Sequence, residues 1–201
     1  MLGRVSVRVW CLRHGESENV IKAMAGAVPS EPLTERGHQQ ALMAARSLAG
    51  EPISRVYSST AVRARQTAQP FAAAPGVEVQ AMPELVEGGV GRHEGSSDPA
   101  VRRRAADVLR SWIVERDLGQ RVGDGESGHE VFARMAAAFR HLTERHAGET
   151  VVVVSHVASL TLALDQLCDL GVAVWGSPLP HAEPFLVEWN GDNWHCPEWP
   201  A

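Results

Sequence analysis

The feature that most constrains the fold is a run of four consecutive valines, residues 151–154, between Thr150 and Ser155. β-Branched residues favour strands, and an unbroken apolar run is typical of a strand that is buried on both faces. Such strands occur mainly in parallel sheets, because helices cover both sides of those sheets. The largely apolar segment from His156 to about Leu170 predicts one of these covering helices.

The rest of the chain alternates strands with helices, which predicts an α/β fold: a single-domain, three-layer α/β/α sandwich over residues 1–201 with a mainly parallel sheet. Apolar patterns predict strands at 5–12, 53–57 and 77–81, and a hairpin between 185–189 and 193–196. Cap residues predict helices from Thr34 to about Gly50, from Ser58-Ser59-Thr60 to about Ala74, at 98–118, and from the capping box of Ser127 and Glu130 to about His146. Residues 20–31, with one helical turn, and 82–128 are expected to face the substrate.

Composition narrows the classes of protein. At 201 residues and 44% hydrophobic content, the chain is long enough for one buried core. The formal net charge of −5 gives no long-range attraction to nucleic acid. Three cysteines without a Cys-x-x-Cys spacing argue against a disulfide framework, and the N-terminal apolar run, interrupted by Arg4 and Arg8, is neither a signal peptide nor a membrane span. We therefore expect a cytoplasmic protein without nucleic-acid or membrane partners. The oligomeric state stays open, and a homodimer is compatible with the sequence.

Several phosphate chemistries lack their essential parts. The single lysine, Lys22, does not follow the glycines of a P-loop, and no cysteine has an arginine six residues later, as a cysteine-phosphatase loop requires. His141 and His146 are five residues apart and so face different sides of a helix, and His129-Glu130 is not completed by a second histidine. The sequence therefore predicts no metal site, and histidine chemistry is the phosphate chemistry that remains.

Cationic and imidazole side chains follow three of the predicted strands. Arg13 and His14 come after the first strand, His156 comes after the valine strand, and Arg63 lies one helical turn beyond the strand at 53–57. The carboxyl ends of parallel strands share one edge of a sheet, so we expect these four side chains to converge. Together they can bind a dianionic phosphoryl group. Each histidine alone could instead cap a helix or pack in the core, but the shared strand ends favour a site.

Short motifs occur in a fixed order along the chain: Leu-Arg-His-Gly-Glu-Ser at 12–17, Tyr-Ser-Ser-x-x-x-Arg-Ala-x-Gln-Thr-Ala at 57–68, Leu-x-Glu at 85–87 with Gly-x-x-Glu-Gly at 91–95, Gly-Glu-Ser at 125–127 and Val-Ser-His at 154–156. With Pro-Leu-Thr-x-x-Gly-x-x-Gln-Ala at 32–41, this set resembles the phosphoglycerate-mutase-like branch of the histidine phosphatase superfamily. The resemblance covers about residues 5–157. It implies that His14 is a nucleophile that becomes phosphohistidine, and that Arg13, Arg63 and His156 hold the phosphoryl oxygens.

The resemblance also assigns a proton donor and two further phosphate contacts. Glu87 is implied as the acid that protonates the leaving oxygen, because the spacing to the 91–95 motif selects it over Glu84 and Glu94. The family's asparagine lies six residues after the nucleophile, and Asn19, five after His14, is expected to contact the phosphate. At Val157, in place of the usual glycine, the backbone amide is expected to serve. No cofactor is implied.

The resulting hypothesis is a phosphomonoesterase that hydrolyses a small phosphorylated metabolite without a metal ion or cofactor. Two alternatives stay open: a phosphoglycerate mutase, and a catalytically silent protein that binds a phospho-ligand. The remainder of the pocket is expected to be lined by residues 21–30, 82–97 and the helix that carries Trp112. The arginines at 102, 103, 104 and 110 either contact an anionic substrate or form a solvated helix face.

Overall fold

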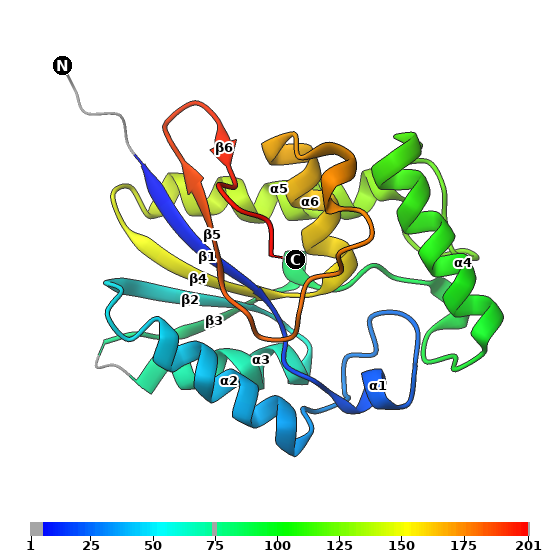
Figure 1. Ribbon diagram of the computed structural model, residues 1–201, viewed down its shortest axis with the longest axis horizontal. Helices are drawn as coiled ribbons and strands as arrows, with labels where there is room; N and C mark the ends of the chain where they lie inside the picture. The colour runs from blue at the N-terminus through cyan, green and yellow to red at the C-terminus, as the bar shows by residue number, and fades with distance from the viewer. Residues whose placement is uncertain (1–5, 74–75, 201) are drawn as a thin grey trace.

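The computed structural model describes residues 6–73 and 76–200. Four strands run parallel: β1 (Val7–Arg13), β2 (Ile53–Ser59), β3 (Val79–Met82) and β4 (Thr150–Ser155). β5 (Phe185–Trp189) pairs antiparallel with β1, and β6 (Trp194–His195) pairs antiparallel with β5. The sheet has the order β3-β2-β4-β1-β5-β6 (Figure 1). The mainly parallel sheet and the C-terminal hairpin are confirmed; the predicted strand start at Val5 lies outside the described residues.

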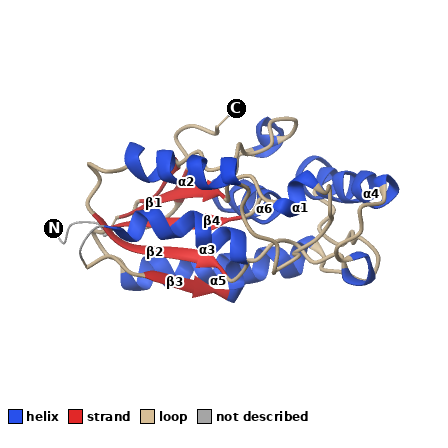
Figure 2. Cartoon of the chain, turned by 90° about the horizontal axis from the view of Figure 1, so that it is seen from below, coloured by secondary structure: helices blue, strands red, loops and turns tan. Residues whose placement is uncertain are grey.

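Helices cover both faces of this sheet. α2 (Glu35–Ser47) and α3 (Val62–Ala68) lie on one face, and α5 (Gly128–Arg145) and α6 (Val157–Cys168) lie on the other (Figures 1 and 2). The central strand β4 shows why. Val152 and Val154 pack with α2 and α3, whereas Val151 and Val153 pack with α5 and α6, and all four are fully buried. Each buried valine stabilises the fold by roughly 1.5–3 kcal/mol, and the three-layer prediction is confirmed.

Of the predicted caps, those of α2 and α5 are confirmed and that of α3 is wrong. Thr34 caps α2 through its side chain, and Ser127 with Glu130 forms the predicted capping box of α5. The cap predicted at Ser58-Ser59-Thr60 is wrong, because β2 continues through Ser59 and the N-cap of α3 is Ala61, without a side-chain cap. α3 gives way to a 3₁₀ turn at Gln69–Ala73. Its predicted end at Ala74 lies outside the described residues.

The helix predicted at 98–118 is shorter than expected. Asp98 caps α4 (Pro99–Arg110), which widens into a π-helical turn at Ser111–Glu115. The turn ends at Arg116, whose φ of 59° is left-handed. From this position Arg116 forms an ion pair with Asp165, a fully buried residue of α6. This contact with a distant element cannot be read from the local pattern.

The remaining elements are short and irregular. α1 (Glu18–Ile21) is a single helical turn, and 3₁₀ turns occur at Pro83–Leu85, Gly91–His93 and Gly171–Val174. α1 and α4 lie beyond the carboxyl edge of the sheet (Figure 1). Within residues 6–73 and 76–200, no helix combines the length and the hydropathy needed to cross a membrane.

Candidate active site

The first residue of the site, His14, directly follows β1 and is 3% exposed. Its Nδ1 donates to the carbonyl of Gly15 at 2.7 Å, and its Nε2 accepts from Nε of Arg63 at 3.1 Å. A carbonyl can only accept and a guanidinium can only donate, so the proton lies on Nδ1 and the lone pair on Nε2. Burial, followed by the charges of His156, Arg63 and Arg13, holds the pKa of His14 well below its usual value. The ring is therefore a neutral imidazole with its lone pair on Nε2.

Arg63 links the two histidines that the sequence predicts to converge. It lies in the first turn of α3, after β2, and is 1% exposed. Besides its bond to His14, its Nη2 donates to Nδ1 of His156 at 3.1 Å. Burial lowers the pKa of Arg63, and the nearby Glu87 is the largest opposing influence. A guanidinium thus lies between two imidazoles, with a carboxylate close to it.

His156 occupies the N-cap position of α6, at the end of β4, and is fully buried. Its Nε2 donates to Oγ of Ser59 at 2.8 Å, and its ring centroid lies 5.1 Å from that of His14. Burial, and then the charges of Arg63, Arg134 and Arg13, hold the pKa of His156 well below its usual value. Both imidazoles are therefore uncharged, and the arginines supply the positive charge of the site.

Arg13 adds a second guanidinium beside His14. Its Nη1 donates to the carbonyl of Leu179 at 3.1 Å, but its Nε is buried without a hydrogen-bond partner among the described residues. A buried donor without a partner is costly and uncommon. An anionic ligand in the pocket that Arg13 lines would satisfy it.

The turn that carries His14 is held by motif residues of two helices. The amide of Gly15 donates to Oγ1 of Thr67 at 3.0 Å, and the amide of Glu16 donates to Oε1 of Gln40 at 2.8 Å. The start of α2 packs so closely that a Cβ on Gly37 would lie 1.9 Å from the carbonyl oxygen of Glu16. Only glycine allows this approach, which explains why the motif at 32–41 matters to a site built around His14.

The loop after α1 is tied to Arg63 as well. The carbonyls of Val28 and Ala27 accept from its Nη1 and Nη2 at 2.7 and 2.8 Å. Val28 has a φ of 34°, a left-handed conformation that is costly for a β-branched residue. Glu94 supports the same loop through the amide of Val28 at 3.4 Å. The strained loop is thereby placed against the guanidinium of the site.

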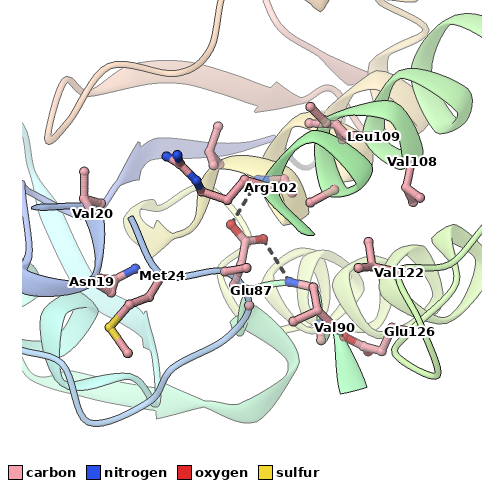
Figure 3. A pocket seen from close by; sticks show the side chains of 18 of the residues that line it. Asn19, Val20, Met24, Glu87, Val90, Arg102, Val108, Leu109, Val122 and Glu126 are labelled. Atoms are coloured by element: carbon pink, nitrogen blue, oxygen red, sulfur yellow. Dashed lines mark hydrogen bonds between the residues drawn. The ribbon is translucent and has the colours of Figure 1, made fainter. Parts of the chain in front are cut away.

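Glu87 brings the carboxyl group. Its Oε1 accepts three hydrogen bonds: from the amide of Gly88 at 2.9 Å, from the amide of Ser159 at 3.0 Å, and from Oγ of Ser159 at 2.9 Å. Its Oε2 accepts from the amide of Ala158 at 3.2 Å. Oε2 therefore accepts fewer hydrogen bonds than Oε1. Of the three glutamates considered at 84, 87 and 94, the pocket lining contains Glu87 (Figure 3).

Asn19 and Val157 line the same pocket. Asn19 is largely buried, and its Oδ1 accepts from Oγ of Ser17 at 2.7 Å. This bond fixes the orientation of the amide group on the pocket wall (Figure 3). The structure therefore places six of the seven predicted site residues in the lining of one pocket. The seventh, His156, does not line the pocket; it is fully buried and is connected to the site through its hydrogen bond with Arg63.

Two components of the site were missed by the sequence interpretation. His181 donates through Nδ1 to the carbonyl of His14 at 3.0 Å, and burial, followed by Arg13, lowers its pKa. The predicted hairpin could have indicated this contact. Its first strand, β5, is antiparallel to β1 and therefore begins at the sheet edge where β1 ends, and His181 lies four residues before β5. The second is Arg134 of α5, which binds both carboxylate oxygens of Glu126 at 2.8 and 2.9 Å.

Across residues 6–73 and 76–200, no three His, Cys, Asp or Glu side chains are grouped so that they could hold a metal ion.

Comparisons with known proteins agree with this geometry. The sequence profile of the histidine phosphatase superfamily (branch 1) matches residues 9–201. A probable phosphoglycerate mutase GpmB of Photorhabdus laumondii is 33% identical over 162 residues, which are 77% of this chain and 71% of the relative. Phosphoserine phosphatase 1 of Hydrogenobacter thermophilus is 32% identical over 155 residues, 77% of this chain and 72% of the relative. The fold matches that of a mycobacterial glucosyl-3-phosphoglycerate phosphatase with a TM-score of 0.82, at 24% identity and over 96% of this chain and 98% of that one. A profile that spans almost the whole chain, together with relatives of this similarity, shows that the protein belongs to branch 1 of the histidine phosphatase superfamily.

Proposed function

We propose that the chain is a phosphomonoesterase that hydrolyses a small phosphorylated metabolite, without a metal ion, through a phosphohistidine on His14. One observation carries this proposal: a neutral imidazole presents its Nε2 lone pair to Arg63 in the pocket that also holds Glu87. A neutral imidazole is a competent nucleophile, and fixed guanidinium groups can stabilise the charge of a transferring phosphoryl group.

The proposed reaction has two steps. Nε2 of His14 attacks phosphorus while Arg13 and Arg63 bind the phosphoryl oxygens, the ester P–O bond breaks, and protonated Glu87 gives its proton to the leaving oxygen. Water then attacks the phosphohistidine and gives a proton to the Glu87 carboxylate. The N–P bond breaks, and inorganic phosphate is released.

The names of the relatives support two related activities. One relative is called a phosphatase and another a probable mutase, and both align with similar identity. A mutase would transfer the phosphoryl group back to substrate, whereas a phosphatase transfers it to water. The two are distinguished by incubation with 3-phosphoglycerate: formation of 2-phosphoglycerate without release of inorganic phosphate would show a mutase.

The phosphohistidine is tested by denaturing quench after mixing with p-nitrophenyl phosphate that carries labelled phosphorus. We expect acid-labile, base-stable label on the wild-type protein and on His38→Ala, a substitution of an exposed histidine of α2. His14→Ala should keep the circular dichroism of the wild type and lose both label and turnover. Label that persists in His14→Ala would falsify the assignment.

A further inference from the structure

The pocket beyond the phosphoryl-binding residues is apolar. The whole pocket, with the phosphoryl-binding residues, has a cavity volume of about 300 Å³. Its walls come from the loop after α1, the Glu87 loop, α4 with the π turn, and the segment before α5 (Figure 3). The apolar side chains that project into it include Met24, Val90, Val108, Leu109, Trp112 and Val122. Val90, Val108, Trp112 and Val122 are each at most 5% exposed. A leaving group in this pocket would therefore contact hydrocarbon.

Glu126 and Trp112 of the wall are already engaged by the protein, whereas Nδ2 of Asn19 and the guanidinium of Arg102 have no partner among the described residues. Both oxygens of Glu126 are bound by Arg134, and one of them also accepts from the amide of Gly89. The indole Nε1 of Trp112 donates to the carbonyl of Gln120 at 3.0 Å. Among the described residues that line the pocket there is no Ser, Thr, Tyr, Gln, Asp or Lys. Away from Asn19 and Arg102, hydroxyl groups of a bound sugar or glycerate would thus lose water without gaining partners, which is unfavourable.

The pocket is also small. Ligand pockets commonly measure about 300–1,000 Å³, so 300 Å³ is at the lower end of that range. At about 30 Å³ for each water-sized group, it holds about ten groups, of which the phosphorus and three oxygens of a phosphoryl group take about four. About six non-hydrogen atoms, one oxygen and about five carbons, remain for the alcohol. A nucleoside or a disaccharide is too large to be enclosed here.

We propose that the substrate is the phosphate monoester of a compact apolar alcohol, a short branched alkyl or a single-ring aryl group that the chamber of Met24, Val90, Val108, Leu109, Trp112 and Val122 encloses. This inference rests on the proposed phosphatase function and adds the substrate class to it. Arg102, the cationic side chain of α4 that lines the pocket, is exposed. It therefore belongs to the rim rather than to the enclosed wall.

A homologous series of primary alkyl phosphates, from methyl to octyl, tests the proposal. Each enclosed methylene should raise kcat/KM about fourfold, as expected for the transfer of one methylene from water. The rise should stop at about five carbons, where the chamber is full. Glycerol 3-phosphate, which is close in size to butyl phosphate, should have a kcat/KM at least tenfold lower than butyl phosphate, because its two hydroxyls find no partners.

A matched pair of substitutions on α4 tests whether the alkyl chain occupies this chamber. Ala105 lines the pocket, whereas Ala100, on the same helix, does not. Ala105→Leu adds three carbons to the wall, so kcat/KM should level off about two carbons earlier in the series. Ala100→Leu should keep the wild-type limit. The same limit in both variants would place the alkyl chain elsewhere and overturn the proposal.

Two other results would also overturn it. One is a flat or falling series while p-nitrophenyl phosphate is still hydrolysed in a His14-dependent way, which leaves the proposed function intact. The other is a preference for an acid-bearing ester, such as phosphoserine, over butyl phosphate that disappears in Arg102→Gln, because the rim cation would then select a second anionic group. Absence of phosphohistidine with every ester would instead overturn the proposed function as well.

Discussion

Hydrogen-bond partners decide which nitrogen of each buried imidazole is available. On His14, the Nδ1–H group donates a hydrogen bond to the carbonyl of Gly15, so the lone pair is on Nε2. On His156 the roles are reversed: Nδ1 accepts from Arg63, and Nε2 donates to Ser59. Both histidines end a parallel strand, but they are not interchangeable. The proposed nucleophile is the one whose Nε2 faces a guanidinium.

Glu87→Gln tests the proposed general acid at the residue scale. Protonation of the leaving oxygen matters most when the alcohol is a poor leaving group, so phosphorylation by alkyl phosphates should slow by about 10²–10⁴-fold. Phosphorylation by p-nitrophenyl phosphate should slow much less, because nitrophenolate leaves without a proton. Single-turnover trapping measures this step separately from the later hydrolysis.

Glu94→Gln is the matched control for Glu87→Gln. Glu94 lies in the same segment but binds the amides of Val90 and Val28 rather than lining the pocket. Any decrease in the phosphorylation rate of Glu94→Gln should therefore be the same for alkyl and p-nitrophenyl phosphates. If Glu94→Gln instead showed the leaving-group dependence and Glu87→Gln did not, the identification of the acid would be wrong.

Residues at strand ends could be predicted from the sequence, and their hydrogen-bond roles could not. The hydrophobic patterns that precede Arg13, His14 and His156 locate them at one sheet edge. The tautomer of His14 depends on the carbonyl of Gly15, and the contact with His181 spans 167 positions. Local pattern carries no information about the contact with His181, because this contact arises from the antiparallel addition of β5 to the sheet.

At the scale of elements, the loop that carries Glu87 has little regular structure and is held by a helix. Arg134 of α5 donates to the carbonyls of Glu84, Val86 and Glu87 at 2.9, 2.7 and 3.2 Å. Glu126 neutralises the guanidinium and also binds the amide of Gly89. One partly buried cation therefore fixes the path of the loop on both sides of Glu87.

Arg134→Met should act on catalysis through the position of Glu87. The substitution keeps the aliphatic stem but removes the donors to three carbonyls and leaves Glu126 without its cation. A displacement of about 1 Å of a catalytic group can cost about 10² in rate, so we expect kcat for alkyl phosphates to fall about 10²-fold with a smaller change in KM. Steady-state kinetics with alkyl and p-nitrophenyl esters measures the effect.

Arg140→Met, at an exposed position of the same helix, is the control and should keep wild-type kinetics. Arg134→Lys restores a charge but not the several fixed donors, so it should recover only part of the rate. A loss in Arg134→Met that is equal for alkyl and p-nitrophenyl esters would show that Arg134 does not act through the general acid.

The same contrast between local and distant interactions explains which elements could be predicted. Capping residues and the 3.6-residue period of α2 and α5 are local, and both helix starts were predicted correctly. The end of α4 was not, because the π turn and the left-handed Arg116 accompany an ion pair with Asp165, 49 residues away. This turn carries Trp112, which lines the pocket as predicted, although the π-helical geometry that positions it was not predicted.

At the scale of the whole molecule, the site places uncharged imidazoles in the interior beside two buried guanidinium groups. The fold was predictable because one strand, β4, must be covered on both faces. The lowered pKa values of the two histidines were not predictable, since they depend on how deeply α3 and α6 bury the site. His14 and His156 are 3% and 0% exposed, and burial is the first cause of their lowered pKa values.

Folding stability should therefore fall as the pH drops below about 6.5, the ordinary pKa of histidine. In the unfolded chain both imidazoles take up a proton there, while in the folded protein their lowered pKa values keep them neutral. The unfolded state then binds more protons, so the free energy of unfolding decreases with falling pH, by about 1.4 kcal/mol per pH unit for each histidine and about 2.7 for both.

Urea unfolding between pH 6.5 and about 5, above the ordinary pKa values of carboxyl groups, measures the slope. The double variant His14→Asn, His156→Asn should lose about 2.7 kcal/mol per pH unit of this slope, and exposed His38→Asn should keep it. A double variant that loses stability as steeply as the wild type would show that the two imidazoles are charged in the folded protein, and with that the neutral nucleophile would be excluded.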